Sequence, residues 1–506
     1  MSILLKVNTM RPRNVLLAVF SLCTLVGIAS IYPKSPSSAQ VDVKQAEAQP
    51  ACQSFRGDIS AESERNILMK ERPLIPIAWY LAAVGQYDQA LELVDRITYC
   101  GSKDLALAGV AASMAKKGQI ERALQLTNTI RSQEEKASVL GSVAEQLVRT
   151  GKHDQAMKLV NDSINYDIDK IRVLNTIVPL WVEVGQLDRA LQAVNTIELD
   201  ANKAIVLSRL ASTLAKASKY EQALEIANTI ANTDESKSLK HAAFVNIAVE
   251  LASSGQIDRA LQLVNPLDSD QKASALGAIA TQLASSGEFD RALQLVNTLQ
   301  SDPAQPIALA RFAESLTEGR QLEQVLQMAK TIKVNSMEQQ SMLSRIAISF
   351  AKVGQFEQAL QVASTIKRDD DKDLALQSIV NSLAKAGQYD QATEVASTIK
   401  VASFKATAFV YIAAGLAETG KVTDAVQVVS AIEERNSLPN IWFSETVMVL
   451  TQAKQFNPAL QIANAVTDEN EKAWILAQLA NNLVEAGQTE LASQAIAPAM
   501  EIVEAY

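Results

Sequence analysis

The sequence predicts an all-α solenoid of about thirteen helical hairpins, and two observations carry this prediction. A seven-residue motif, GQFEQAL at 354–360, recurs in recognisable form along four-fifths of the 506-residue chain. The copies begin at Gly85, Gly118, Gly151, Gly185, Ser218, Gly255, Gly287, Arg320, Gly354, Gly387, Gly420, Lys454 and Gly487. Successive copies are 32 to 37 residues apart, and most steps are 33 or 34. A regular period of this length is typical of a repeat array.

Each repeat reads as two amphipathic helices. In the segment 136–150, the apolar residues recur at spacings of three and four, which indicates one helical stripe. Gly151 ends this helix, because glycine adopts the left-handed conformation that a helix end requires. The second helix begins near Asp154, and an acid stands at this place in eleven of the thirteen repeats. Negative charge there is favoured by the amide groups of the helix N-terminus.

Two positions are almost always small. Alanine stands five residues after the motif begins in every repeat except at Val325, and seven residues before the motif except at Val178, Val380 and Val447. Small side chains let two helix backbones approach closely, while the neighbouring leucines fill the layer between repeats. We expect Ala292 to be such a contact.

The pattern resembles the tetratricopeptide repeat. Ala347, Gly354, Phe356 and Ala359 match the order of small residue, glycine, aromatic residue and alanine in that 34-residue unit. The resemblance implies a right-handed superhelix that binds peptides along a groove lined by the first helices. The chain departs from the family in lacking most first-helix tryptophans and closing prolines. An armadillo-like or pentatricopeptide-like solenoid is the alternative.

Composition narrows the class of partner. The net charge is −9, and the charged residues, 20% of the chain, are interspersed. Nucleic-acid binding requires clustered lysine and arginine, so we expect no nucleic-acid partner.

The N-terminus predicts export. Arg11 and Arg13 precede an uncharged run over 15–31, and small residues follow up to Ala39. This arrangement is typical of a signal peptide, residues 1–39, with a periplasmic, extracellular or cell-envelope destination. The run is also near the lower length limit of a membrane-spanning helix, so an uncleaved N-terminal anchor is the alternative. No other segment is predicted to span a membrane.

Residues 40–72 are predicted to be a polar tether followed by a short capping helix at Ser60–Lys70, and 73–506 are the repeat array. A cap is expected because the first repeat of a solenoid has no preceding neighbour. In an oxidising compartment, Cys52 and Cys100 could form a disulfide between tether and first hairpin; two free thiols are the alternative.

No catalytic or metal-binding pattern breaks the repeat. Ten repeats carry lysine near the start of the first helix, but the end of the preceding second helix favours a cation there, and acids flank most of these lysines. His153 and His241 are far apart in sequence, and Asp369–Asp371 lack the alternating ligands of a calcium loop. We therefore predict no enzyme activity, no cofactor and no metal.

The remaining candidate is the groove. Mapping the family's groove positions onto the N-terminal half gives Trp79, Lys116, Glu145, Arg149, Arg172, Asn175, Glu183 and Lys216. In the C-terminal half the same mapping includes Glu318 and Asn481. Ordinary solvated helix faces are the competing interpretation.

The sequence therefore favours an exported, non-catalytic repeat scaffold that binds a protein or peptide. A glycan-associated or cell-wall-associated module related to lytic enzymes is one alternative. Self-association through an exposed terminal repeat, near Trp442 and Trp474, is another.

Overall fold

The structure is a computed structural model, and it describes residues 69–164, 166–299, 305–316, 319–331, 337–435 and 441–505. The chain divides into two units, Met1–Ala51 and Cys52–Tyr506, and all described residues belong to the second. The predicted signal or anchor, the tether, Cys52 and nearly all of the predicted capping helix lie outside the described residues.

The described residues form twenty-six helices in consecutive pairs, which confirms the predicted all-α solenoid of thirteen hairpins. The first helices are α4 (Leu74–Ala83), α6 (Cys100–Lys116), α8 (Gln133–Arg149), α10 (Asp167–Glu183), α12 (Asp200–Lys216), α14 (Lys237–Ser253), α16 (Ser269–Ser285), α18 (Gln305–Ser315), α20 (Met337–Lys352), α22 (Asp369–Lys385), α24 (Ala402–Glu418), α26 (Ile441–Gln452) and α28 (Glu469–Glu485). The second helices are α5 (Tyr87–Asp95), α7 (Ile120–Thr127), α9 (His153–Ser163), α11 (Leu187–Val194), α13 (Tyr220–Thr229), α15 (Ile257–Val264), α17 (Phe289–Asn297), α19 (Gly319–Thr331), α21 (Phe356–Thr365), α23 (Tyr389–Thr398), α25 (Val422–Arg435), α27 (Phe456–Asn464) and α29 (Thr489–Glu504).

The turn inside each hairpin is set by the first residue of the motif. Ten motif glycines have φ between +74° and +90°, the left-handed region that ends a helix. At Gly151, the amides of Gly151 and Lys152 donate to the carbonyls of Val148 and Leu147, at 3.0 and 2.8 Å. Ser218 and Lys454 replace glycine and still take φ of 60° and 58°. The backbone conformation is therefore kept even where the side chain disfavours it.

The small positions lie at the helix contacts, as expected. The twelve motif alanines and Val325 are all 0% exposed, and the alanines seven residues before the motif are equally buried. One continuous apolar cluster extends from Leu74 to Val503. The array therefore has one main core that passes from repeat to repeat, beside a small separate cluster of Ala406, Val410 and Ile432.

The longest repeat step inserts a short turn between α13 and α14. The Ser236 hydroxyl, which is fully buried, donates to the carbonyl of Ala231 at 2.6 Å and lies 2.7 Å from the Thr233 hydroxyl. These bonds satisfy the polar groups of the inserted residues, so the extra length is absorbed without disturbing the stack.

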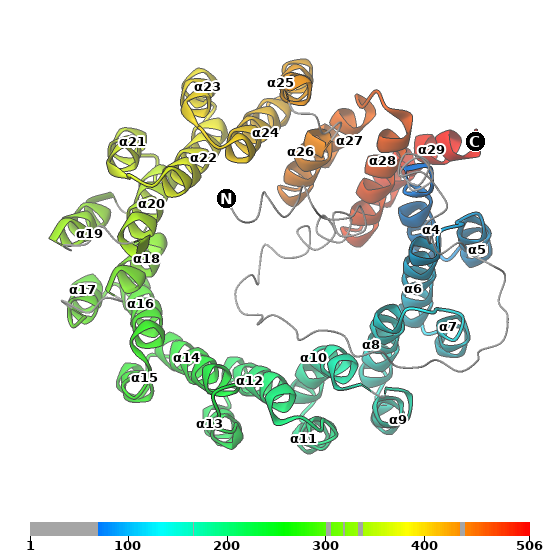
Figure 1. Cartoon of the computed structure of the whole chain (residues 1–506), viewed down its shortest axis with the longest axis horizontal. Coiled ribbons are helices and arrows are strands. Elements are labelled where there is room, and N and C mark those ends of the chain that lie inside the picture. Colours follow the sequence, from blue (N-terminus) through cyan, green and yellow to red (C-terminus); the bar gives the residue numbers. More distant parts are fainter. Residues whose placement is uncertain are drawn as a thin grey trace. The chain divides into compact units, whose positions relative to one another are not determined.

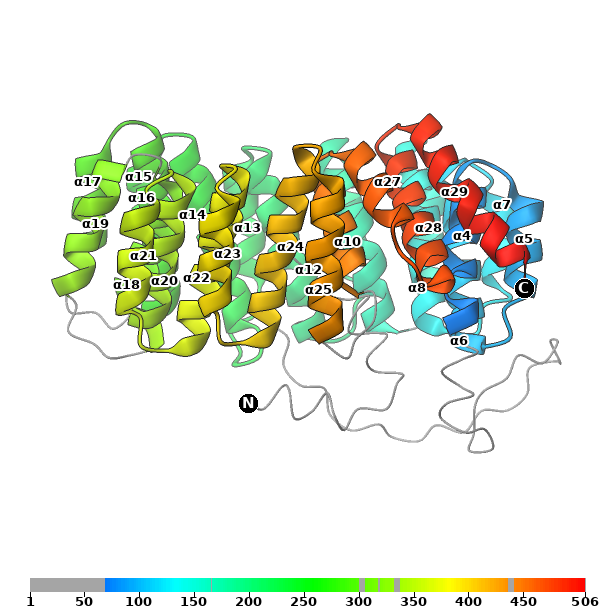
Figure 2. The same cartoon turned by 90° about the horizontal axis from the view of Figure 1, so that it is seen from above.

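The two ends of the array pack on each other. Each first helix contacts the next, and α4 also contacts α28 and α29, so the helices of this unit close into a ring (Figure 1). Figure 2 shows these helices side by side, running roughly parallel to the axis of the ring. The expectation of an exposed terminal repeat is therefore wrong: Trp474 is only 8% exposed, because Arg72 covers it. The outward face of the first repeat is likewise covered by the last repeat.

Candidate binding surface

The first helices lie on the inner side of the ring and the second helices lie outside them (Figure 1). Consecutive first helices pack directly against one another, whereas the second helices form a separate, more widely spaced outer row. The inner side is therefore a continuous helical surface, and a candidate binding surface is sought there.

The predicted groove residues fall on five consecutive first helices. Trp79 lies on α4, Lys116 on α6, Glu145 and Arg149 on α8, Arg172, Asn175 and Glu183 on α10, and Lys216 on α12. Lys116, Arg149, Arg172, Glu183 and Lys216 are exposed, and the other three are half-buried. The sequence therefore predicted correctly that these residues share one set of helices. Whether they bind a partner stays a prediction.

Two of the groove arginines are paired within this surface. The Arg149 Nε donates to Glu145 Oε1 at 2.9 Å along α8, and Arg172 of α10 reaches Glu134 of α8 at 3.0 Å. Each pair is exposed, so each contributes little stability and remains available for exchange with a charged ligand. The free positive charge of this region is consequently smaller than the sequence alone indicates.

Trp79 has a packing role. It lies against Gly109 of α6, where an added Cβ would come within 2.0 Å of the indole nitrogen. Glycine at 109 therefore makes room for the indole ring. The Asn175 Oδ1 is buried and has no protein partner within the described residues.

Uncharged polar groups connect adjacent first helices farther along the ring. Asn246 of α14 donates to the Ser212 hydroxyl of α12 at 2.9 Å, and Ser253 of α14 lies 3.5 Å from Gln282 of α16. Arg345 of α20 pairs with Glu314 of α18. The inner surface thus combines hydroxyl, amide and paired charged groups, which suit the backbone of an extended chain.

The C-terminal half differs from the sequence-based mapping. The Asn481 Nδ2 donates to the Pro76 carbonyl at 2.8 Å, so this side chain helps to hold the ends of the ring together. Glu318 lies outside the described residues. Two groups that the sequence did not single out, Tyr411 and Glu445, lie on neighbouring first helices. Burial raises the pKa of both, and Glu445 further raises that of Tyr411.

Several of the ten lysines near the starts of first helices neutralise helix ends. Lys240 donates to the carbonyls of Asn228 and Ile230, and Lys405 donates to Ser397 at 2.7 Å, in each case at the end of the preceding second helix. Lys103 pairs with Asp95 at 3.0 Å. Lys170 instead reaches the Thr196 carbonyl at 3.0 Å, just after the second helix of its own hairpin. These lysines are structural, as the sequence interpretation favoured.

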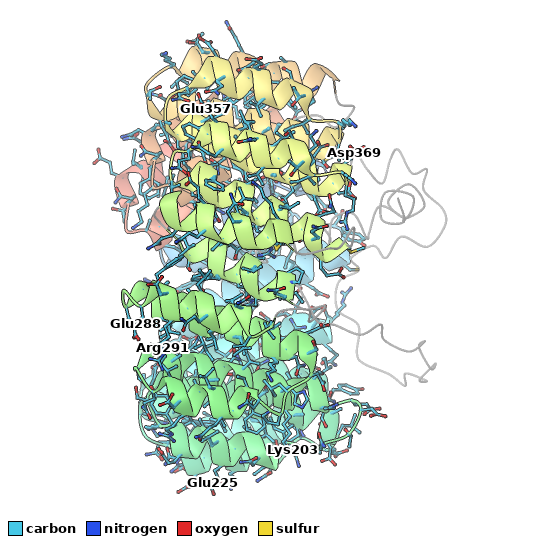
Figure 3. The ribbon with its side chains drawn as sticks, turned by 90° about the vertical axis from the view of Figure 1, so that its left-hand side faces the viewer. Lys203, Glu225, Glu288, Arg291, Glu357 and Asp369 are labelled. Carbon is cyan, nitrogen blue, oxygen red and sulfur yellow. The ribbon has the colours of Figure 1, made fainter. Side chains whose placement is uncertain are left out.

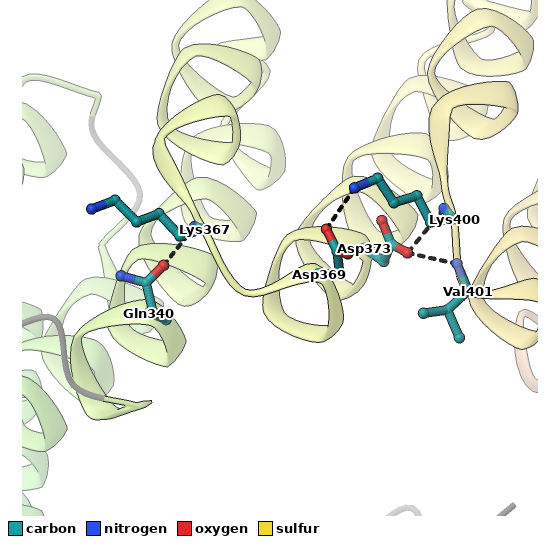
Figure 4. A network of polar contacts seen from close by, with 6 residues as sticks. All are labelled: Gln340, Lys367, Asp369, Asp373, Lys400 and Val401. Carbon is teal, nitrogen blue, oxygen red and sulfur yellow. Dashed lines mark hydrogen bonds and ion pairs between the residues drawn. The ribbon is translucent and has the colours of Figure 1, made fainter. Parts of the chain in front are cut away.

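Buried acids and an amide fix the loops between hairpins, and sequence reasoning missed them. Asp373 accepts from the amides of Lys400 and Val401 at 3.0 and 2.7 Å, and Gln340 accepts from Lys367 at 2.6 Å (Figure 4). Asp104 and Glu71 hold the corresponding loops of earlier repeats. The signal was available: 71, 104, 340 and 373 are separated by multiples of about one repeat.

Exposed ion pairs connect neighbouring second helices. Arg259 reaches Glu221 at 3.0 Å, Arg122 reaches Asp88 at 3.6 Å, and Arg189 reaches Asp154. Figure 3 places Glu288 and Arg291 at the edge formed by the hairpin turns, with Asp369 at the opposite edge. The motif acid therefore serves both the helix N-terminus and the adjoining repeat.

Each of the two histidines contacts one side chain of a neighbouring element. His153 accepts from the Trp181 indole at 3.3 Å, and His241 lies 3.3 Å from Asp268. Within the described residues, no group of three or more His, Cys, Asp or Glu side chains could hold a metal. Nor does any described helix combine the length and apolar character that a bilayer crossing requires.

Cys100, at the start of α6, is disulfide-bonded. Its predicted partner Cys52 lies outside the described residues, so this pairing stays a prediction.

Comparison with known proteins finds solved helical-repeat structures that are similar at low identity. No family model and no curated protein matches the chain. Among solved structures, the maize pentatricopeptide repeat protein PPR10 is similar at 15% identity, covering 84% of this chain and 68% of that one, with a TM-score of 0.36. The Cut9–Hcn1 hetero-tetramer of the APC/C (15% identity, 87% and 88% covered, TM-score 0.26) also matches. So does a circular tandem repeat protein (13%, 88% and 98%, TM-score 0.16).

The paired helices, the left-handed turns and the shared core define this chain as a helical-repeat protein of the α-solenoid class. Its narrower assignment to tetratricopeptide-like repeats is a proposal.

Proposed function

We propose that this chain is an exported, non-catalytic tetratricopeptide-like scaffold that binds an extended protein segment along its first helices. The observation that carries the proposal is the inner surface. The four first helices α6, α8, α10 and α12 end in the exposed charged residues Lys116, Arg149, Glu183 and Lys216. An extended peptide offers backbone donors and acceptors at regular intervals, and such groups meet hydroxyl, amide and charged side chains well.

Charge supports a protein partner over a nucleic acid. The chain is acidic overall, and the two groove arginines are paired with Glu145 and Glu134. Phosphate backbones are bound by clustered, unpaired cations, and the pairing of these two arginines with acids reduces the cationic character of this surface.

The test is to select peptides that bind the protein from a library of linear peptides. The protein used is the full chain as its host processes it. Substitution of Lys116 and Lys216 by glutamate is expected to lower the affinity of the protein for the selected peptides at least tenfold. Reversal of Lys158 and Lys330, exposed lysines on the second helices α9 and α19, is the matched control and should leave binding unchanged. Equal loss in both variants would contradict a groove on the first helices.

The same protein should be offered soluble cell-wall glycan fragments and single-stranded RNA as competing probes. Binding of glycan without peptide would favour the lytic-enzyme-related alternative. RNA binding that the Lys116 and Lys216 reversal abolishes would overturn the assignment of a protein partner.

Export is tested by the N-terminus of the protein recovered from its host. Cleavage of the signal segment predicts a mature chain that begins at Gln40. A chain that keeps residues 15–31 and fractionates with membranes would instead establish the anchor.

A further inference from the structure

The joint that closes the ring is built from two surfaces at opposite ends of the chain. On one side, Leu74, Ile77 and Leu81 of α4 are buried, although no repeat precedes α4 in sequence. On the other side, α28 packs more extensively against α4 than against its own neighbour α26. The terminal repeat, α28 with α29, therefore packs extensively on the first repeat.

A polar latch adds specificity to this apolar contact. Arg72 Nη1 donates to Glu471 Oε2 at 2.8 Å, and the Glu471 side chain is only 5% exposed. The same guanidinium lies 3.5 Å from the centre of the Trp474 ring. Arg96 also donates to the Val503 carbonyl at 2.9 Å. Arg72 on one surface and Glu471 on the other are thus partly buried charged groups, and each would be left without a partner if the joint opened into an apolar environment.

No peptide bond crosses this joint, because Arg72 and Glu471 are 399 residues apart. Closure within one chain is favoured by an effective concentration on the order of millimolar. The two surfaces are complementary but different, so the contact is head-to-tail. A head-to-tail surface can be satisfied equally by the corresponding surface of another copy.

We propose that the α28–α29 surface is an interaction surface for the α4 surface of a second copy of this chain, so that two copies exchange their terminal repeats. At micromolar protein concentration, the protein is a monomer in which the chain closes into a ring on itself. The exchanged dimer forms when the latch within one chain is disfavoured. This interaction is independent of the peptide binding proposed above, because it uses the ends of the array rather than its inner surface.

Charge reversal on each side of the latch provides the test. Glu471→Arg places two arginines across the joint of one chain, and Arg72→Glu places two carboxylates there. In an equimolar mixture of the two variants, each copy presents the surface that the other requires, with one native and one reversed ion pair. Light scattering of the full chain, as processed by its host, should show monomers for each variant alone and twice the monomer mass for the mixture.

The double variant Arg72→Glu/Glu471→Arg is the matched control, because it restores an ion pair within one chain and should remain monomeric. Trp474→Ala supplies a second route that does not depend on charge: it should accelerate exchange between two differently tagged copies at least tenfold over the unsubstituted chain. A mixture that stays monomeric while both reversed variants keep their helix content would overturn the proposal. Unchanged exchange by Trp474→Ala would count equally against it.

Discussion

The joint between α22 and α24 and the joint between α28 and α4 use similar apolar packing, but the chain connects only the first. Between α22 and α24, Asp373 accepts hydrogen bonds from the amides of Lys400 and Val401, which are only 27 and 28 residues ahead. These amides lie in the loop that leads directly into α24. Between α28 and α4, the ion pair of Arg72 and Glu471 joins residues 399 apart. An internal joint is therefore formed by local contacts, whereas the closing joint depends on all thirteen repeats having the correct curvature.

This difference limits what each joint can contribute. In a repeat array, stability is approximately a sum of repeat terms and nearest-neighbour interface terms. Loss of an internal contact lowers that sum directly. Loss of a closing contact can lower stability by no more than the free energy of closure, because the ring then opens and the array remains folded.

The largest expected effect is the loss of a tryptophan inside the array, compared with the loss of a tryptophan at the closing joint. Trp181→Ala removes a side chain that is 0% exposed inside the array, and it should cost about 3–5 kcal/mol of unfolding free energy. Trp474→Ala, at the closing joint, should cost clearly less. Urea denaturation followed by circular dichroism measures both. Equal losses would show that closure and array unfold as one unit.

A smaller effect is expected at the loop between hairpins. Asp373→Ala leaves the amides of Lys400 and Val401 without an acceptor, and a buried unsatisfied group costs about 1–3 kcal/mol. Asp373→Asn keeps an acceptor oxygen and should lose less. If the two substitutions had the same urea midpoint, the carboxylate would not be the group that holds this loop.

Overpacking tests the close approach of the helices in an internal repeat. Ala292 is 0% exposed, so Ala292→Leu should cost about 1–3 kcal/mol. Ala217→Leu, at an exposed position, is the control and should have little effect. An unchanged urea midpoint for Ala292→Leu would contradict the assigned repeat register.

The smallest effect is a gain. Ser218 and Lys454 hold left-handed φ values that glycine adopts without steric cost, so Ser218→Gly should stabilise the protein by about 0.5–1 kcal/mol. Lys454→Gly relieves the same strain in the repeat next to the terminal one. Thermal unfolding measures both, and a loss of stability at Ser218 would show that its side chain contributes more than its backbone costs.

The motif made much of the fold predictable. Gly151 predicted a left-handed helix end and Ala292 a fully buried contact, because both depend on local conformation and on size at one repeat position. The groove residues from Trp79 to Lys216 were placed on the correct helices for the same reason. Asp373 was missed because only a few repeats carry a polar side chain at its position. Asn481 was misassigned because its partner, Pro76, lies 405 residues away.

The sequence by itself determined the hairpin, its period and the small residues at the helix contacts, since these depend on propensity and burial within one or two repeats. Only the tertiary structure decided that the array closes. Closure depends on the sum of small rotations over thirteen joints, and no single repeat specifies that sum. Because the array closes, Trp474 is covered by Arg72, and Arg72 forms an ion pair with Glu471.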